Sequence, residues 1–208
     1  MTSPAPFTYA IDQVKGFLDP DEGKALYEEC FARAGLGPVL EIGSYCGKST
    51  IYLGKAAEQK SGLVYALDHH RGSEEHQKGE GYHDPELYDD ELGVMDTLPY
   101  FRRAIFKAGL EKTVLPVVGD SAMAGRHWQT PLSMLFIDGG HSMEQALTDW
   151  QGWWRHVMAG GTLAIHDIFE NPEEGGRPPY EIYKLALGSG LFELKARVKT
   201  LGLLTRLG

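Results

Sequence analysis

The stretch that decides the fold is Val39-Leu40-Glu41-Ile42-Gly43-Ser44-Tyr45-Cys46-Gly47-Lys48-Ser49-Thr50. The apolar run from Pro38 to Ile42 predicts a buried strand, and a helical pattern starts near Ser49. Gly43 and Gly47 interrupt the chain between these two elements. Strand, tight turn and helix are therefore expected in succession, and the N–H groups that open such a helix attract an anionic group of a ligand.

Two nucleotide-binding motifs fit this turn poorly. A phosphate-binding Walker loop has four residues between its first glycine and Gly-Lys-Ser, whereas Gly43 and Gly47 enclose three. The dinucleotide fingerprint Gly-x-Gly-x-x-Gly has its second glycine where this chain has Tyr45. What remains is Glu-x-Gly-x-x-x-Gly, beginning at Glu41. An ordinary strand-to-helix turn without a ligand is the alternative.

Length and composition predict one α/β domain over residues 1–208, with 42% hydrophobic and 24% charged residues. No apolar run reaches the length of a membrane span and the start lacks a signal pattern, so we expect a cytoplasmic protein with no membrane partner. The net charge is −9, and residues 71–98 contribute nine acidic against two basic side chains. Without a basic stripe to neutralise phosphates, nucleic acid is a poor partner, and we expect none. Cys30 and Cys46 are expected to be reduced thiols.

The first third of the chain predicts a cover, two core elements and a lid. A helix capped by Asp19 and ended by Gly35 belongs to an N-terminal cover, residues 1–36. A helix over 49–59 and a strand over 63–67 follow. Residues 69–95 are irregular, acidic and contain four histidines, which is typical of a lid beside a ligand cleft. A metal site among these histidines is the less favoured alternative, because their spacing matches no common ligand pattern.

The remaining chain alternates helices and strands before it closes in a hairpin. The predicted helices cover 97–108, 143–158 and 180–187, and the predicted strands cover 114–118, 133–137, 162–165, 192–198 and 201–206. Pro116 favours a sheet edge for its strand because it cannot donate to a ladder on both sides. The helix over 143–158 is expected to bury Leu147, Trp150, Trp154 and Val157 and to expose His156. In the hairpin, Phe192, Leu194, Ala196 and Val198 are expected on one face.

Polar or glycine residues stand at the ends of five predicted strands. They are Gly43, Asp68, Asp120, Asp138 and the pair His166-Asp167. Because the carboxyl ends of parallel strands meet at one edge of a sheet, these residues predict a ligand cleft there. An acid in the position of Asp68 suits hydrogen bonds from both hydroxyls of a ribose. A purely local role in capping a loop is the alternative for Asp68.

The stretch Leu40 to Ser49 resembles the first motif of the class I S-adenosylmethionine methyltransferases. It is particularly similar to catechol O-methyltransferase and related small-molecule O-methyltransferases. The resemblance implies a Rossmann-like, doubly wound α/β fold with seven strands in the order 3-2-1-4-5-7-6, mostly parallel with a C-terminal antiparallel hairpin. It also implies S-adenosyl-L-methionine as the cofactor and transfer of its methyl group to a hydroxyl of a small-molecule acceptor.

The resemblance further implies which residues hold the cofactor. The methionine end is expected over 43–49, the ribose on Asp68 and the adenine near Asp120. The full set of expected cofactor-binding residues is Glu41, Gly43, Ser44, Tyr45, Gly47, Lys48, Ser49, Asp68, His69, Gly119, Asp120, Ser121 and Asp138.

The same resemblance implies a divalent cation. Metal-dependent O-methyltransferases have an acid at the end of strand four and a pair of ligands at the end of strand five, and Asp138 and Asp167 match this pattern. His166 departs from it, since imidazole suits Zn²⁺, Fe²⁺ or Mn²⁺ better than Mg²⁺. Asp138, His166 and Asp167 are therefore the candidate ligands, with the identity of the metal open. A mere hydrogen bond from His166 to a neighbouring loop is the alternative.

His141 is the candidate general base, because related enzymes have a catalytic lysine or histidine three residues after the acid that corresponds to Asp138. A role for His141 in capping the next helix is the alternative. Two other functions stay open: a module that binds the nucleoside cofactor without turnover, and a nicotinamide-dependent oxidoreductase. The identity of the acceptor is not predicted, and a homo-oligomer is left open.

Overall fold

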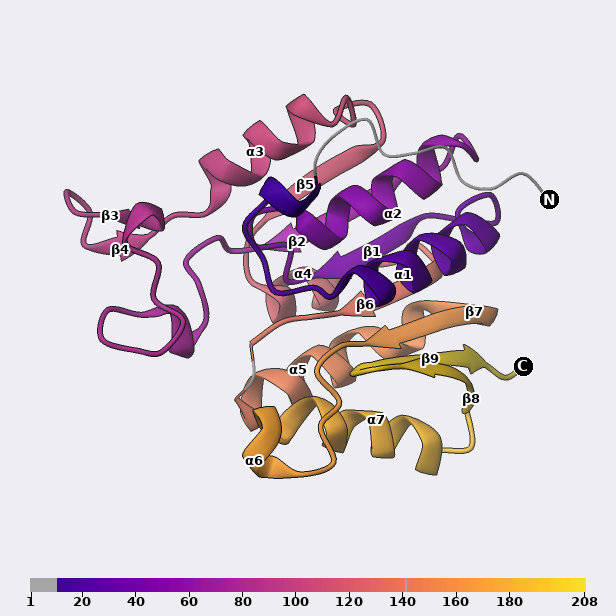
Figure 1. Ribbon diagram of the computed structural model, residues 1–208. Coiled ribbons are helices and arrows are strands. Elements are labelled where there is room, and N and C mark those ends of the chain that lie inside the picture. Colours follow the sequence, from indigo (N-terminus) through magenta and orange to yellow (C-terminus); the bar gives the residue numbers. More distant parts are fainter. Residues whose placement is uncertain (1–10, 141) are drawn as a thin grey trace.

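A seven-stranded sheet runs through the centre of the molecule, as the computed structural model shows for the described residues, 11–140 and 142–208 (Figure 1). The strands lie in the order β5-β2-β1-β6-β7-β9-β8. Neighbouring strands from β5 to β7 are parallel, and β9 runs antiparallel to both β7 and β8. The strand bounds are β1 Val39–Ile42, β2 Val64–Asp68, β5 Val114–Val118, β6 Leu132–Ile137, β7 Val157–Ile165, β8 Phe192–Val198 and β9 Leu201–Arg206.

This sheet confirms the expected topology. The labels β3 and β4 belong to a separate two-stranded hairpin, so the seven strands counted alone have the order 3-2-1-4-5-7-6. The edge position of Pro116 is confirmed as well, since β5 pairs only with β2 in the described sheet and Pro116 lies opposite Ala66. The carboxyl ends of the parallel strands therefore meet at one edge, where the expected cleft residues stand.

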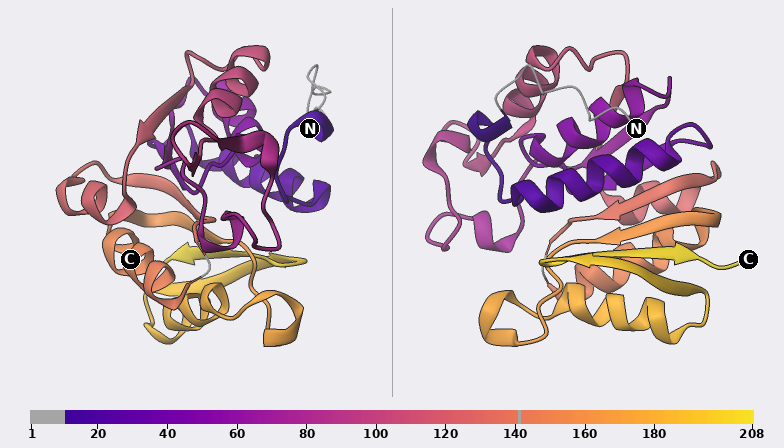
Figure 2. Two further views of the ribbon diagram at one scale, coloured as in Figure 1. Left: turned by 90° about the vertical axis from the view of Figure 1, so that its left-hand side faces the viewer. Right: turned by 45° about the vertical axis from the view of Figure 1, so that its right-hand side comes forward.

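Helices cover both faces of the sheet (Figures 1 and 2). One layer consists of α1 (Pro20–Arg33), α2 (Lys48–Glu58) and α3 (Leu98–Lys107), and the other of α4 (Ser121–His127), α5 (Met143–Trp153) and α7 (Pro178–Gly188). Strand β6 shows how the two cores are divided: Phe136 packs with the first layer, while Leu135 and Ile137 pack with the second. This alternation follows from the twofold period of side chains along a strand.

The start of α1 is the capped helix that the sequence predicts. The Asp19 side chain accepts a hydrogen bond from the N–H of Asp21, at 2.8 Å, and Glu22 closes a capping box. Pro20 occupies the first helical position, where its missing N–H costs nothing. The helix ends at Arg33, and α1 packs against α2. Residues 1–10 of the expected N-terminal cover lie outside the described residues.

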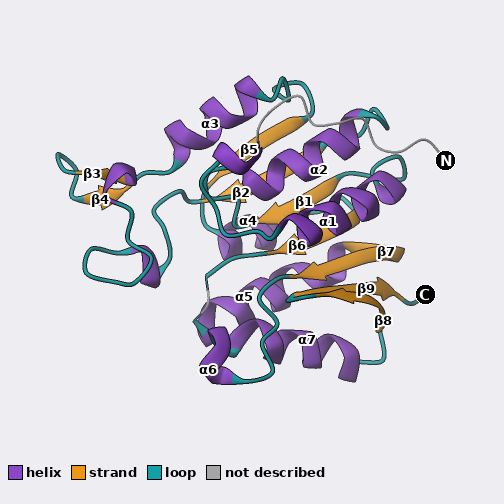
Figure 3. Ribbon diagram, in the orientation of Figure 1, coloured by secondary structure: helices purple, strands orange, loops and turns teal. Residues whose placement is uncertain are grey.

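The lid insertion is the segment 69–95, named for the role that the sequence predicts. It leaves the sheet after β2 and carries a small hairpin, β3 (Tyr88–Asp89) with β4 (Val94–Met95) (Figure 3). Two single 3₁₀ turns, Glu74–His76 and Pro85–Leu87, precede it, and a third 3₁₀ turn, Ile11–Gln13, lies near the other end of the chain. The sequence did not predict the hairpin because two residues a strand are too few to show alternation. Lys15 binds Asp84 and also Glu86, at 2.8 Å, so the segment before α1 holds the lid insertion.

The helix expected over 143–158 is shorter than predicted. It ends at Trp153, a 3₁₀ turn follows over Trp154–His156, and β7 begins at Val157. Trp153 is fully buried and donates its Nε1–H to Ser121 Oγ, at 2.9 Å. Val157 is thus a strand residue, and the expected exposure of His156 is wrong. Its ring is half-buried against Trp153, and burial lowers its pKa.

Other differences concern short elements. Neither α4 nor the single turn α6 (Pro172–Gly175) was predicted, because runs this short lack a helical apolar stripe. In the hairpin, Phe192 is buried but Leu194 is 49% exposed. The register of β8 against β9 shifts between Leu194 and Ala196, which breaks the expected common face.

The thiols behave as predicted. Cys30 and Cys46 are both free and buried, and Cys30 donates its S–H to the carbonyl of Leu53. Burial raises the pKa of each thiol to about 12, so both are protonated at neutral pH. Among the described residues, no helix has the length and apolar character that crossing a membrane requires.

Candidate functional site

The turn between β1 and α2 forms part of the wall of a cavity of about 860 Å³ at the carboxyl edge of the sheet. Gly43 has φ +86°, and a β-carbon there would stand 2.0 Å from the carbonyl oxygen of Asp138. Only glycine allows this approach of two backbones. Ser44, Tyr45, Lys48 and Ser49 also line the cavity. Gly47 does not line it; with φ +93°, it caps α2 and faces Phe101.

Ser44 has an unusual hydroxyl. The residue is 1% exposed, it lines the cavity, and its Oγ has no hydrogen-bond partner in the described part of the chain. An unpaired buried hydroxyl costs free energy, which a ligand with a polar group at this point would recover. The turn therefore has the form of a binding site as well as the sequence of one.

Glu41 lies behind the turn and does not line the cavity. It is fully buried, and Thr50 Oγ1 donates to its Oε2, at 2.5 Å. Direct contact of Glu41 with a ligand, as the sequence led us to expect, does not fit this position. Burial is the main cause that raises the pKa of Glu41 to about 8, so the carboxyl is mostly protonated at neutral pH.

The buried Glu41 carboxyl should make stability depend on pH. Its pKa is raised from 4.5 to about 8, so the folded state holds a proton that the unfolded state releases between these values, and stability falls as pH rises through this window. By pH 7 the loss relative to pH 4 amounts to about 3 kcal/mol. Urea unfolding of the native chain and of Glu41→Gln at several pH values measures this slope. The prediction is wrong if both proteins show the same slope.

Asp68, at the end of β2, fastens two loops of the site. Its Oδ2 accepts the N–H of Tyr45 at 2.8 Å, and its Oδ1 accepts the N–H of His70 at 2.7 Å. Each carboxylate oxygen keeps a second lone pair, and Asp68 lines the cavity, so it is free to accept from two further donors there. His69 is exposed at the same wall.

Gly119 and Ser121 line the wall beyond β5, but Asp120 does not. The Asp120 side chain is exposed and caps α4 by accepting the N–H of Met123, at 2.8 Å. Its predicted ligand contact is therefore replaced by a helix cap. Ser121 points inward, where Trp153 binds its hydroxyl.

Asp149, on α5, is a cavity residue that the sequence analysis missed. It is 1% exposed and accepts from Gln145 Nε2 through Oδ1, at 3.0 Å, while no described residue binds Oδ2. Burial raises its pKa to about 6. The sequence indicated only that Asp149, three residues after Ala146, lies on the inward face of α5. Every core-facing residue of that helix has the same spacing, so the spacing does not mark a cavity residue.

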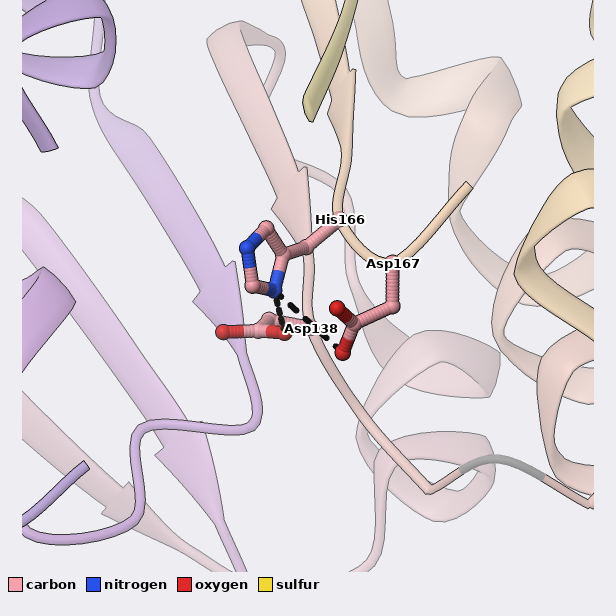
Figure 4. A group of neighbouring side chains, drawn as sticks. All are labelled: Asp138, His166 and Asp167. Atoms are coloured by element: carbon pink, nitrogen blue, oxygen red, sulfur yellow. Dashed lines mark hydrogen bonds and ion pairs between the residues drawn. The ribbon is translucent and has the colours of Figure 1, made fainter. Parts of the chain in front are cut away.

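Asp138, His166 and Asp167 converge as the sequence predicted (Figure 4). His166 Nδ1 lies 2.9 Å from Asp138 Oδ1 and 3.4 Å from Asp167 Oδ2. One ligand atom from each residue lies within 4.8 Å of the others, so the three residues could together hold a cation. Asp167 has φ +55°, a left-handed conformation that turns its carboxylate back toward His166. No second group of this kind forms among the described residues, so the lid histidines do not gather into a metal site.

Glu22, in the first turn of α1, reaches the same cluster. It is 3% exposed, and its Oε2 lies 2.9 Å from His166 Nε2. Its Oε1 accepts from the N–H and the hydroxyl of Thr200, at 2.8 and 2.7 Å. The sequence showed only a good helix start here, because residues 144 positions apart carry no sign of contact. Burial alone lowers the pKa of His166, but the carboxylates of Asp138, Asp167 and Glu22 outweigh it and raise that pKa well above its usual range.

Four aromatic rings line one part of the cavity. Phe17, Tyr45, His76 and Tyr82 all line it, and Phe17 lies 5.2 Å from Tyr82 and 6.1 Å from Tyr45 between ring centroids. These rings come from the segment before α1, the β1–α2 turn and the lid insertion. His141, the candidate base, lies outside the described residues, although Gly140 and Ser142 on either side of it line the cavity.

Comparison with known proteins identifies the family. The model of a family described as a methyltransferase domain matches residues 40–168, well over half of the chain. The chain belongs to this family. The methyltransferase match begins at β1 and ends just past the pair His166-Asp167, so it spans the strand ends that line the cavity.

Solved structures show the same methyltransferase fold at low identity. Cofactor-bound Rv0187 from MTB is 18% identical with a TM-score of 0.68, covering 93% of this chain and 84% of that one. The O-methyltransferase TomG from Streptomyces achromogenes, in complex with SAM, is 14% identical with a TM-score of 0.63, over 92% and 82%. An rRNA methylase from Streptococcus thermophilus is 14% identical with a TM-score of 0.58, over 93% and 100%. The fold thus serves unlike acceptors, and only the site distinguishes them.

The close approach at Gly43 should make this position intolerant of any side chain. We expect Gly43→Ala to destabilise the methyltransferase by more than about 2 kcal/mol, because the β-carbon would strike the Asp138 carbonyl and the φ angle is positive. Chemical unfolding measures this loss. Gly152→Ala, on α5 where a β-carbon meets nothing within 4 Å, is the matched control and should leave stability equal or slightly higher. Native-like stability of Gly43→Ala would contradict the described turn.

Proposed function

We propose that this chain is an O-methyltransferase that uses S-adenosyl-L-methionine and a divalent cation to methylate a hydroxyl of a small molecule. The observation that carries the proposal is the convergence of Asp138, His166 and Asp167 on the edge of the same cavity that the β1–α2 turn lines. The family match supports methyl transfer, and the structure of TomG in complex with SAM supports that cofactor.

The residues present fit the cofactor. A cavity of about 860 Å³ lies within the range for ligands of this size. Three features of its wall suit a polar ligand: Gly43, where the backbone carries no side chain, the unpaired Ser44 hydroxyl, and the spare lone pairs of Asp68. In the proposed arrangement the methionine end lies over the turn, Asp68 accepts from the ribose, and the adenine lies near Ser121, where Asp149 Oδ2 accepts from a base N–H.

The residues also fit a cation. Two carboxylates and an imidazole suit Mn²⁺, Fe²⁺ or Zn²⁺ better than Mg²⁺. Glu22 behind His166 completes the carboxylate–histidine arrangement typical of protein metal sites. A divalent cation supplies Lewis acidity, which lowers the pKa of a hydroxyl that a histidine alone cannot deprotonate at neutral pH.

In the proposed reaction the chain itself performs three tasks. Asp68 and the β1–α2 turn orient the methyl donor, and the lid insertion with Phe17 limits access of water to the cavity. His141 takes the proton of the acceptor hydroxyl as general base. A small acceptor is favoured over RNA because the net charge is −9 and a nucleic-acid site needs basic groups.

Cofactor binding should depend on Asp68. We expect Asp68→Asn to weaken binding of S-adenosyl-L-methionine by about tenfold or more, since an amide offers one acceptor oxygen where two are used. Calorimetric titration measures the dissociation constant. Asp120→Asn is the matched control, because Asp120 also follows a strand but caps α4 outside the cavity. Equal affinity of Asp68→Asn and the native chain would contradict the proposed cofactor position.

Metal binding should depend on Asp138, and turnover should require the bound metal. We expect a Mn²⁺ isotherm in the native chain that is lost in Asp138→Asn and kept in Glu170→Gln, whose exposed carboxylate lies outside the cluster. A screen of hydroxyl-bearing acceptors by mass spectrometry, with and without Mn²⁺, then tests turnover. Cofactor binding without product from any acceptor would support the rival function, a binding module. Equal product formation with and without Mn²⁺ would contradict the proposed role of the cation.

A further inference from the structure

The ring of His166 has two nitrogens that face different partners. Nδ1 faces Asp138 Oδ1 and Asp167 Oδ2, at 2.9 and 3.4 Å, within the candidate cation site. Nε2 faces Glu22 Oε2, at 2.9 Å. A ring nitrogen that ligates a cation offers its lone pair, and the other nitrogen must then hold the proton of the ring, so the partner of one nitrogen decides what the other can do.

Glu22 is held so that it acts only as an acceptor. Its Oε1 takes two hydrogen bonds from Thr200, one of them from a backbone N–H that cannot reverse its direction. Its Oε2 lies between His166 Nε2 and the N–H of Asp19, the latter at 3.4 Å. With 3% exposure, the side chain has little room to turn away. A carboxylate in this position requires a proton on His166 Nε2.

We infer that Glu22 is a positioning residue: it fixes the proton of His166 on Nε2 and so directs the Nδ1 lone pair toward a divalent cation held with Asp138 and Asp167. This inference rests on the proposed function, because it assigns a role toward the proposed cation. It also gives α1 a function in the site, since the first turn of that helix and the turn between β8 and β9 together hold the Glu22 carboxylate.

Glu22→Gln tests this role directly. The amide has one acceptor and one donor, yet both sides of residue 22 face donors in the native chain. The backbone N–H of Thr200 must keep an acceptor, so the amide nitrogen turns to His166 and Nε2 becomes an acceptor, which leaves the proton of the ring on Nδ1. A protonated Nδ1 cannot ligate. Loss of a carboxylate that hydrogen-bonds the non-ligating nitrogen of a metal-bound histidine typically weakens metal affinity by about 10- to 100-fold.

Glu29→Gln is the matched control. Glu29 lies on the same helix, is 5% exposed and also accepts on both oxygens, from Arg33, Thr162 and Lys195. It is not part of the cation cluster, so its amide variant should lose comparable stability without a change in metal affinity. Titration with Mn²⁺ alone and titration with S-adenosyl-L-methionine alone are measured for both variants and for the native chain.

We expect about 10- to 100-fold weaker Mn²⁺ binding in Glu22→Gln only, with cofactor affinity unchanged in all three proteins. Equal Mn²⁺ affinity in Glu22→Gln and the native chain, or an equal loss in both variants, overturns the role of Glu22 and leaves the proposed function standing. Absence of Mn²⁺ binding by the native chain overturns the cation site and this inference together. Absence of cofactor binding contradicts the proposed methyl transfer by itself.

A second measurement does not depend on a variant that folds. Nitrogen-15 NMR of histidine-labelled native chain, with Zn²⁺ as the diamagnetic probe, reports which ring nitrogen carries the proton. We expect Nε2 of His166 to be protonated and the resonance of Nδ1 to move on addition of Zn²⁺. An unprotonated Nε2, or a shift at Nε2 instead of Nδ1, overturns the inference.

Discussion

The backbone of Gly43 lies directly against the carbonyl of Asp138, and the geometry of the site depends on this contact. Because residue 43 has no β-carbon, β1 and β6 stay side by side to their last residues. The chain can then turn into α2 on one side while Asp138 stays at the strand end beside His166. A side chain at residue 43 would separate the β1–α2 turn from the acidic cluster, and the proposed reaction requires these two parts to be adjacent.

Carboxyl groups hold most of the other parts of the site in place, and the burial of each one is compensated in a different way. Asp68 accepts hydrogen bonds from two backbone N–H groups, and Glu22 binds His166 and Thr200. Glu41 instead keeps its proton, because burial raises its pKa. The cluster of Asp138 and Asp167 has only one imidazole between its two carboxylates. An excess of negative charge at that point is the electrostatic environment that a divalent cation requires.

Much of the site could be predicted because its residues are local in sequence. Gly43, Ser44, Asp68, Ser121 and Asp138 stand at strand ends, and all of them line the cavity. Sequence position alone wrongly predicted a ligand contact for Glu41 and Asp120. Both stand where expected, but Glu41 binds Thr50 and Asp120 caps α4. Glu22 and Asp149 were missed because each lies on a helix, where an inward-facing acid looks like any other residue of that face.

The sequence by itself determined the sheet: apolar runs and turns specified the strands, and the order of seven strands followed from the resemblance carried by 40–49. It also located the carboxyl edge, since strand direction follows from alternation with helices. Only the tertiary structure decided which way each polar side chain points and which distant residue meets it. Glu22 reaches His166 across 144 positions, and such a contact depends on packing α1 against the sheet, which no local pattern encodes.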